Sequence, residues 1–261
     1  MFIFEIIRPG SWLVTDDKDW RFKITGLIDQ LSSSFFEANI ALNKFTELNE
    51  AQIPSHVERL ANFYKNSDKL SEIRKKICEE TGLNEIKDGR ELHFLTERRF
   101  NIERWANGEI PETFKSYEIH IYAKAFLFAL DTIFETLKKL ASEPGVPVSL
   151  SRIRDDALGL FPDLREIRNS AHHLEDRVRF VGNKRQPIPL KIESFETTTV
   201  KSTGGTMVIG MIEGNNYGFT MGDGKFGSIP VSPETLSMIQ KVVQDVYEAF
   251  EWKGIKEHMP R

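Results

Sequence analysis

Arginine, asparagine and two histidines lie within six residues of one segment, LREIRNSAHHLEDRVRF. They are Arg168, Asn169, His172 and His173. A guanidinium stays charged and presents a planar fork of donors that matches phosphate oxygens. Histidine is the side chain best suited to proton transfer near neutral pH. The residue types therefore suit a phosphate-bearing ligand, and RNA above all.

The charge balance allows a local basic site but argues against a protein that coats nucleic acid. The formal net charge of the 261 residues is −4. Around the motif the balance reverses, because residues 165–185 hold six basic side chains against three acidic ones. A confined phosphate site is thus compatible with the chain, whereas binding by bulk electrostatic attraction is not.

Apolar residues at helical spacing predict that one helix carries the motif. Pro162 lies where a first-turn proline belongs, and the apolar positions after it recur every three or four residues: Leu164, Ile167, Ala171, Leu174 and Val178. On a helical wheel the polar cluster falls on the opposite face. We therefore expect the cluster to point away from its own core. A cleft there would need a second wall, from another segment or from another subunit.

The most apolar segment of the chain follows Pro111 and reads ETFKSYEIHIYAKAFLFALDTIFETLKKLA. Its middle is apolar nearly all round, which predicts a central core helix. His120, Lys124 and Asp131 form one polar line on that helix, within about 40° on the wheel. These groups either pair with each other or reach solvent at a seam, or they face a functional site.

Helical periodicity predicts further helices on both sides of this segment. Residues 1–25 instead indicate a short strand-like edge, closed by Pro9 and Gly10, and then an irregular stretch. Ser67 is a candidate N-cap and Gly82 a candidate helix stop. The expected helices cover residues 27–45, 55–64, 67–82, 89–105, 150–160 and 232–250.

Residues 186–231 change to β-rich runs separated by glycine-containing turns, which predicts a small antiparallel meander. Ser232 and Pro233 then form an N-cap followed by a first-turn proline. The predicted fold is therefore mainly α, a helical bundle with a small antiparallel β meander inserted before the last helix. We expect an N-terminal part, residues 1–108, and a bundle, residues 109–261.

The order of these elements resembles the HEPN superfamily. A core helix, a short helix, a helix with an Arg-Asn-x-x-x-His motif at its start, and a closing helix are similar to that family's four- or five-helix bundle. Its motif is an arginine and a histidine four to six residues apart, usually with a polar residue after the arginine. Here Arg168, Asn169 and His173 match it. The helices of residues 27–108 and the meander lie outside a minimal HEPN domain.

The resemblance implies a metal-independent endoribonuclease, a toxin or phage-defence effector, that works as a homodimer with both motifs in one cleft and needs no cofactor. His173 would act as general acid or base, Arg168 would stabilise charge on the phosphorane, and Asn169 would position the phosphate. Arg165, His172 and Arg177 would contact the RNA backbone. Expected partners are RNA, a second copy of the chain, and a cognate antitoxin or nucleotidyltransferase.

Several alternatives stay open at this point. On an ideal helix His172, four residues after Arg168, lies closest to it, whereas the family spacing selects His173, which we follow. The cluster could instead be a solvated helix face with ion pairs to Glu166, Glu175 or Asp176. It could also be a dimer interface without catalysis. The alternative function is a non-catalytic HEPN module that binds a nucleotide or a partner protein.

Other classes of site find little support in the sequence. Cys78 is the single cysteine, so neither an internal disulfide nor a thiolate zinc site is possible. No histidine and acid grouping has zincin spacing, and neither a nucleophile elbow nor a phosphate loop occurs. The longest apolar stretch is too short to span a membrane. We expect a cytoplasmic protein with no membrane partner and no metal.

Overall fold

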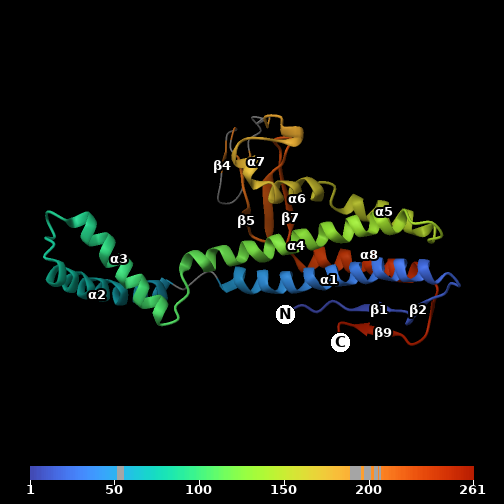
Figure 1. Ribbon diagram of the computed structural model, residues 1–261, viewed down its shortest axis with the longest axis horizontal. Helices are drawn as coiled ribbons and strands as arrows, with labels where there is room; N and C mark the ends of the chain where they lie inside the picture. Colours follow the sequence, from blue (N-terminus) through green and yellow to red (C-terminus); the bar gives the residue numbers. More distant parts are fainter. Residues whose placement is uncertain (52–55, 189–194, 197–200, 203–204, 206) are drawn as a thin grey trace. The chain divides into compact units, whose positions relative to one another are not determined.

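The computed structural model describes residues 1–51, 56–188, 195–196, 201–202, 205 and 207–261 (Figure 1). The fold is mainly helical, with 63% helix and eight α-helices in this part of the chain, and with small antiparallel sheets. By its internal contacts the chain divides into unit 1, residues 1–49 and 119–261, and unit 2, residues 50–118. The division after residue 108 that the sequence suggests stays a prediction.

Four long helices supply most of the core of unit 1. They are α1 (Lys18–Ala51), α4 (Glu112–Ala141), α5 (Ser149–Leu160) and α8 (Pro233–Ala249). The apolar stripe predicted on α1 is buried, as Phe35 and Leu42 at its centre are fully inaccessible. The helix begins at Lys18, earlier than periodicity indicates, because the Asp17 carboxylate accepts the backbone N–H of Trp20 at 2.9 Å and caps the first turn.

The last helix and the core helix agree with the sequence. Ser232 is the N-cap of α8, where its hydroxyl accepts the backbone N–H of Thr235, and Pro233 is the first helical residue. Ile239 and Val243 on its apolar face are fully buried. In α4 most apolar side chains between Ile119 and Leu140 are buried, which confirms its central place.

The helix that carries the motif is shorter than predicted. The expected single helix through Val178 is wrong: α6 (Leu164–His172) ends at His173, whose φ of −103° and ψ of 52° are not helical, and α7 (Leu174–Val178) follows. As a result Val178 is 63% exposed, while Arg177 is 3% exposed. The Arg177 guanidinium binds the Ser170 hydroxyl and the Val181 carbonyl. These bonds stabilise the turn and place an arginine where a continuous helix would bury a valine.

The predicted meander is present before α8. Its strands are β5 (Met211–Glu213), β6 (Asn216–Thr220) and β7 (Phe226–Pro230), paired antiparallel in that order. A further short pair joins β3 (Phe195–Glu196) to β4 (Lys201–Ser202), and residues 189–194, 197–200, 203–204 and 206 of the predicted meander lie outside the described residues. The sheet packs against α6, where a Cβ on Gly227 would lie 3.1 Å from Ile167 Cγ1.

The two ends of the chain pair with each other. β1 (Ile6–Arg8) is antiparallel to β9 (Glu257–Met259), and β2 (Trp12–Leu13) to β8 (Trp252–Lys253). Figure 1 shows the two termini side by side. The side-chain amide of Gln244 accepts from the Ile7 N–H and donates to the Ile7 carbonyl, so α8 satisfies the other edge of β1.

Unit 2 is built from two helices, α2 (His56–Thr81) and α3 (Gly89–Ala106). The sequence predicts three helices here, and the break at Ser67 is wrong: residues 65–68, with neither proline nor glycine, continue α2. Gly82 ends α2 with a φ of +72°, as expected of a helix stop. Ile73, Ile77, Leu92 and Phe100 form the described core.

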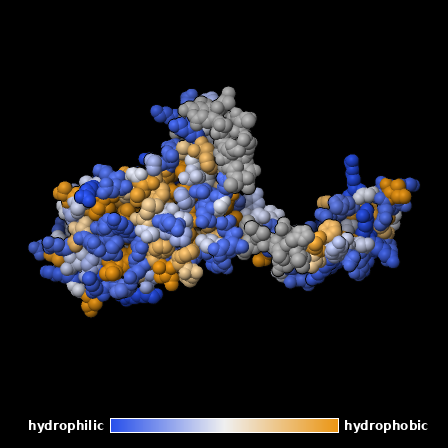
Figure 2. All heavy atoms as spheres, turned by 180° about the vertical axis from the view of Figure 1, so that it is seen from behind, coloured by the Kyte–Doolittle hydropathy of each residue, from blue (hydrophilic) through white to orange (hydrophobic). Residues whose placement is uncertain are grey.

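Hydrophobic and hydrophilic side chains both contribute to the surface. On the face shown in Figure 2, hydrophobic and hydrophilic residues are interspersed. In the described part of the chain, none of the helices combines the length and the apolar character of a membrane span.

Candidate functional site

The motif arginine is held by the core helix of its own chain. Arg168 Nε on α6 donates to Asp131 Oδ2 on α4 at 2.7 Å, and Arg168 Nη1 donates to Asn169 Oδ1 at 2.9 Å. The Arg168 side chain is 24% exposed and that of Asp131 12%. Among the described residues Nη2 of Arg168 has no partner. The guanidinium is therefore fixed on two sides while its remaining donors stay available.

α4 and α6 run past each other in opposite directions. His172 packs on Phe128, and Arg168 pairs with Asp131. One turn further along α4, the pKa of Glu135 is lowered, first by a hydrogen bond from Lys138 and then by the charges of Lys138, Arg165 and Arg168. Residues spaced three or four apart on a helix share one face, so Phe128, Asp131 and Glu135 all face α6. We call this contact region the α4–α6 seam; it comprises Lys124, Phe128, Asp131 and Glu135 on α4 and Arg165, Arg168 and His172 on α6.

The two histidines of the motif have different neighbours. Their rings touch edge to face, with centroids 4.8 Å apart, and both side chains are exposed. His172, the last residue of α6, also lies 6.0 Å from the Phe128 ring on α4. His173 lies outside the helix, with Nδ1 3.6 Å from Glu175 Oε1. The pKa of Glu175 is lowered, first by its own backbone N–H and then by His173.

This arrangement corrects the expectation that the whole cluster turns away from its core. The arginine instead lies at the rim of the core and contacts α4 of the same chain. The sequence signal for this contact is the i, i+4, i+7, i+11 spacing of Lys124, Phe128, Asp131 and Glu135. The predicted polar line contained the first and third of these residues but not the other two.

Of the predicted polar line, His120 separates from the motif, whereas Lys124 stays at one end of the seam. His120 packs against Tyr217 on β6 with ring centroids 6.2 Å apart, and burial lowers the pKa of His120. Lys124 Nζ lies 5.5 Å from the centre of the Phe128 ring. Within the described residues no carboxylate pairs with Lys124, so this end of the seam carries a cation without an acidic partner.

The two predicted backbone-binding arginines differ in position. Arg165 is exposed on α6, on the motif side of the helix. Arg177 is buried, and its Nε and Nη1 are used within the chain by Ser170 at 3.1 Å and Val181 at 2.6 Å. The expectation that Arg177 contacts RNA does not fit this burial, because a buried guanidinium with internal partners cannot reach a ligand on the surface.

Three groups beside the motif are close enough to approach one cation. Ligand atoms of His173, Glu175 and Asp176 lie within 4.8 Å of one another. Two of the three residues are exposed, and exposed acidic groups commonly cluster without a metal. We therefore assign no metal to this grouping.

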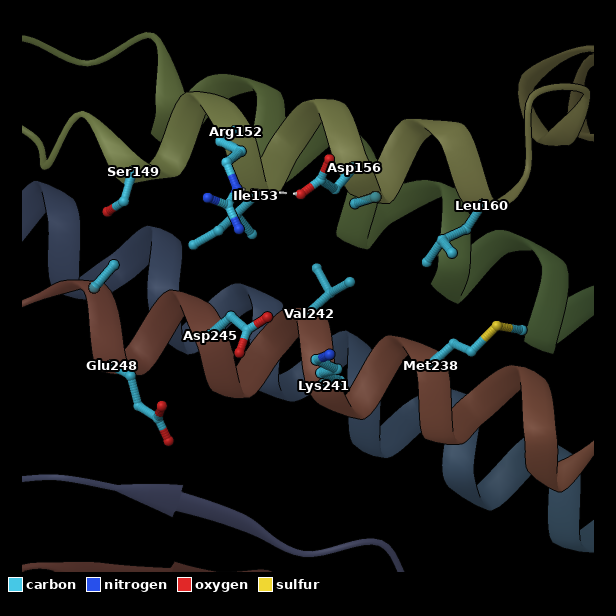
Figure 3. A pocket seen from close by; sticks show the side chains of 12 residues that line it. Ser149, Arg152, Ile153, Asp156, Leu160, Met238, Lys241, Val242, Asp245 and Glu248 are labelled. Carbon is cyan, nitrogen blue, oxygen red and sulfur yellow. Dashed lines mark ion pairs between the residues drawn. The ribbon is translucent and has the colours of Figure 1, made fainter.

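A groove between α5 and α8 lies apart from the motif. It measures about 760 Å³ and has an apolar floor that includes Ile153 and Val242. Figure 3 shows Arg152 and Asp156 on its α5 side, joined as an ion pair at 3.6 Å, and Lys241 and Asp245 on α8. The described residues that line the groove include neither a histidine nor a cysteine, and we assign no chemistry to it.

Comparison with known proteins adds no relative. No protein-family model matches the sequence, and neither a curated protein nor a solved structure matches the chain.

Proposed function

We propose that the chain is a metal-independent endoribonuclease of HEPN type, and that the motif beside the α4–α6 seam is its active site. The observation that carries the proposal is the state of Arg168. Asp131 and Asn169 fix its guanidinium, its Nη2 donors have no partner among the described residues, and two exposed imidazoles follow it. A fixed arginine with free donors next to histidines suits a phosphodiester that gains charge during reaction.

In the proposed reaction an imidazole takes the proton from a ribose 2′-hydroxyl, and the 2′-oxygen attacks the adjacent phosphorus. The bond from phosphorus to the 5′-oxygen breaks, and that oxygen receives a proton from an acid. The products are a 2′,3′-cyclic phosphate and a 5′-hydroxyl. Arg168 stabilises the charge that builds on the phosphorane, and Asn169 holds both the arginine and the phosphate.

His173 is the proposed acid–base group. Glu175 faces its Nδ1, and a carboxylate in that position orients an imidazole and stabilises its protonated form. Nε2 then remains for the substrate. One such histidine serves one proton transfer at a time, so we propose that a second copy of the chain brings a second motif to the same cleft.

The test is cleavage of single-stranded RNA by the purified protein in the presence of EDTA. We expect Arg168→Ala and His173→Ala each to reduce the initial rate by about 10²- to 10⁴-fold. Matched controls are Arg152→Ala and His93→Ala, which remove an exposed arginine and an exposed histidine elsewhere. Cleavage that survives both motif substitutions would refute the assigned site. Loss of cleavage with EDTA alone would refute the metal-independent mechanism.

A second candidate is a non-catalytic HEPN module that binds a nucleotide or a partner protein. The observation in its favour is that Asp131 already balances the charge of Arg168, as in a structural ion pair. Binding of a nucleotide or a partner protein by wild type, without any 2′,3′-cyclic phosphate product from RNA, would favour this candidate. If the chain is a toxin or a phage-defence effector, expression of wild type will arrest growth, and expression of Arg168→Ala will not.

A further inference from the structure

The end of the seam occupied by Lys124, Phe128 and His172 carries an aromatic row that the proposed reaction does not use. The His172 ring is exposed, has the Phe128 ring behind it at 6.0 Å and meets the His173 ring edge to face at 4.8 Å. An edge-to-face contact covers one face of one ring at most, so it leaves ring surface open. The imidazole is thus supported by its neighbours and still offers a face to a ligand.

A cation lies at the end of this row. Lys124 Nζ is 5.5 Å from the centre of the Phe128 ring and, in the described part of the chain, has no acidic partner. Lys124 and Asp131 are seven residues apart on α4, which places them about 10 Å apart along the helix. Lys124 thus lies on the other side of Phe128 from Asp131 along α4, which places its ammonium to meet a different phosphate from the one at Arg168.

We propose that His172, supported by Phe128, stacks the nucleobase next to the scissile phosphate, and that Lys124 binds the neighbouring phosphate. Alternation of aromatic rings and basic side chains is how proteins hold single-stranded nucleic acid without reading its sequence, because every base has a π-face. This subsite rests on the proposed RNA-binding role of the motif, and it adds a recognition element that the catalytic groups do not provide.

The test uses binding rather than cleavage. The probe is a short single-stranded oligonucleotide with 2′-O-methyl riboses, which cannot supply a 2′-hydroxyl and therefore stays intact. A second probe has the same sugar–phosphate backbone without bases. Fluorescence anisotropy gives the Kd of each probe for wild type, Phe128→Leu, His172→Ala and Lys124→Gln. Matched controls are Phe22→Leu, His93→Ala and Arg152→Gln, all at exposed positions outside the seam.

We expect Phe128→Leu and His172→Ala each to weaken binding of the base-containing probe by about 5- to 100-fold, since stacking of one base accounts for such a factor. The same variants leave binding of the base-free probe unchanged. Lys124→Gln weakens both probes and reduces the salt dependence of binding, because it removes a phosphate contact. The control variants bind both probes as wild type does.

Two outcomes would overturn the subsite. In the first, Phe128→Leu and His172→Ala raise the Kd of the base-containing and the base-free probe by the same factor. In the second, wild type binds the two probes with equal affinity. Failure of the ribonuclease proposal is distinct. If wild type binds the base-containing probe more tightly but never cleaves RNA, the subsite is supported and the ribonuclease proposal is refuted. If wild type cleaves RNA but binds both probes equally, the ribonuclease proposal is supported and the subsite is refuted.

Discussion

Arg168 on α6 and Asp131 on α4 are joined by a 2.7 Å hydrogen bond between residues 37 positions apart in the chain. Because both side chains are less than one-quarter exposed, the pair is shielded from water more than a surface ion pair is. The bond therefore links the motif to the core: it orients the guanidinium and ties α6 to the central helix.

The pair should contribute measurably to stability. We expect Arg168→Ala to lower the free energy of unfolding by about 1–3 kcal/mol, because it leaves the buried Asp131 carboxylate without its partner. The double variant Asp131→Asn, Arg168→Ala should lose less than the sum of the two single variants. Chemical denaturation of the four proteins gives the coupling energy directly. Additive losses would mean that the bond contributes nothing to the fold.

Substitution of Arg177 should affect stability, whereas substitution of Arg165 should affect RNA binding. Arg177→Met leaves the Ser170 hydroxyl and the Val181 carbonyl without their donor, so we expect a loss of about 1–3 kcal/mol in unfolding free energy. Arg165→Met removes an exposed side chain and should change stability by no more than about 0.5 kcal/mol. It should, however, weaken RNA binding. The reverse assignment of effects would place Arg177, and not Arg165, at the ligand.

Gly227 on β7 should not tolerate a side chain. A Cβ there would lie 2.9 Å from Met221 Sδ and 3.1 Å from Ile167 Cγ1, where the sheet meets α6. We expect Gly227→Ala to destabilise the protein by about 1–3 kcal/mol through overpacking. Gly159→Ala on α5 is the control, since nothing lies within 4 Å of its Cβ and alanine favours the helix. Thermal unfolding should lower the Tm of the first variant and leave that of the second unchanged or higher.

Tyr217 on β6 should make stability fall at high pH. Burial raises the pKa of its phenol from the ordinary value of 10.0 to about 12. The folded protein thus keeps this proton where the unfolded chain has lost it. The contribution is complete below about pH 9 and is lost as the pH rises towards 12, a fall of about 1–2 kcal/mol between roughly pH 9 and pH 11.5.

The comparison that isolates this residue is Tyr217→Phe, which removes the titrating group and keeps the ring. Its unfolding free energy should fall less than that of wild type over the same pH range. Tyr247, whose pKa burial also raises, remains in both proteins and cancels in the difference. Identical pH profiles would show that the Tyr217 phenol does not titrate differently in the two states.

Local patterns in the sequence account for most of the helices. The apolar stripe from Leu31 to Phe45 and the cap at Ser232 act within one helix, so periodicity and capping rules are sufficient to find them. The segment after the motif helix, α7, is different. Arg177 is a charged residue, which a sequence pattern places at the surface. It is buried, and Val178 exposed, because Arg177 donates hydrogen bonds to Ser170 and Val181 in the folded chain.

The candidate site shows the same limit. Residue types and spacing predict the motif as a site, but a helical wheel describes one helix at a time and does not determine which neighbouring helix it contacts. The contact of Arg168 with Asp131 depends on how α4 and α6 pack, and so does that of His172 with Phe128. The pairing of β1 with β9 is similarly a contact between distant segments, each too short to be recognised alone.

That pairing has a consequence for synthesis. The ribosome releases α1 early, yet β1 before it has its strand partner in residues 257–259 and its side-chain clamp in Gln244. A nascent chain must therefore leave the Ile6–Arg8 backbone groups to water until residues 257–259 have been synthesised. A truncation before residue 257 would therefore remove β9 and also leave β1 without its strand partner.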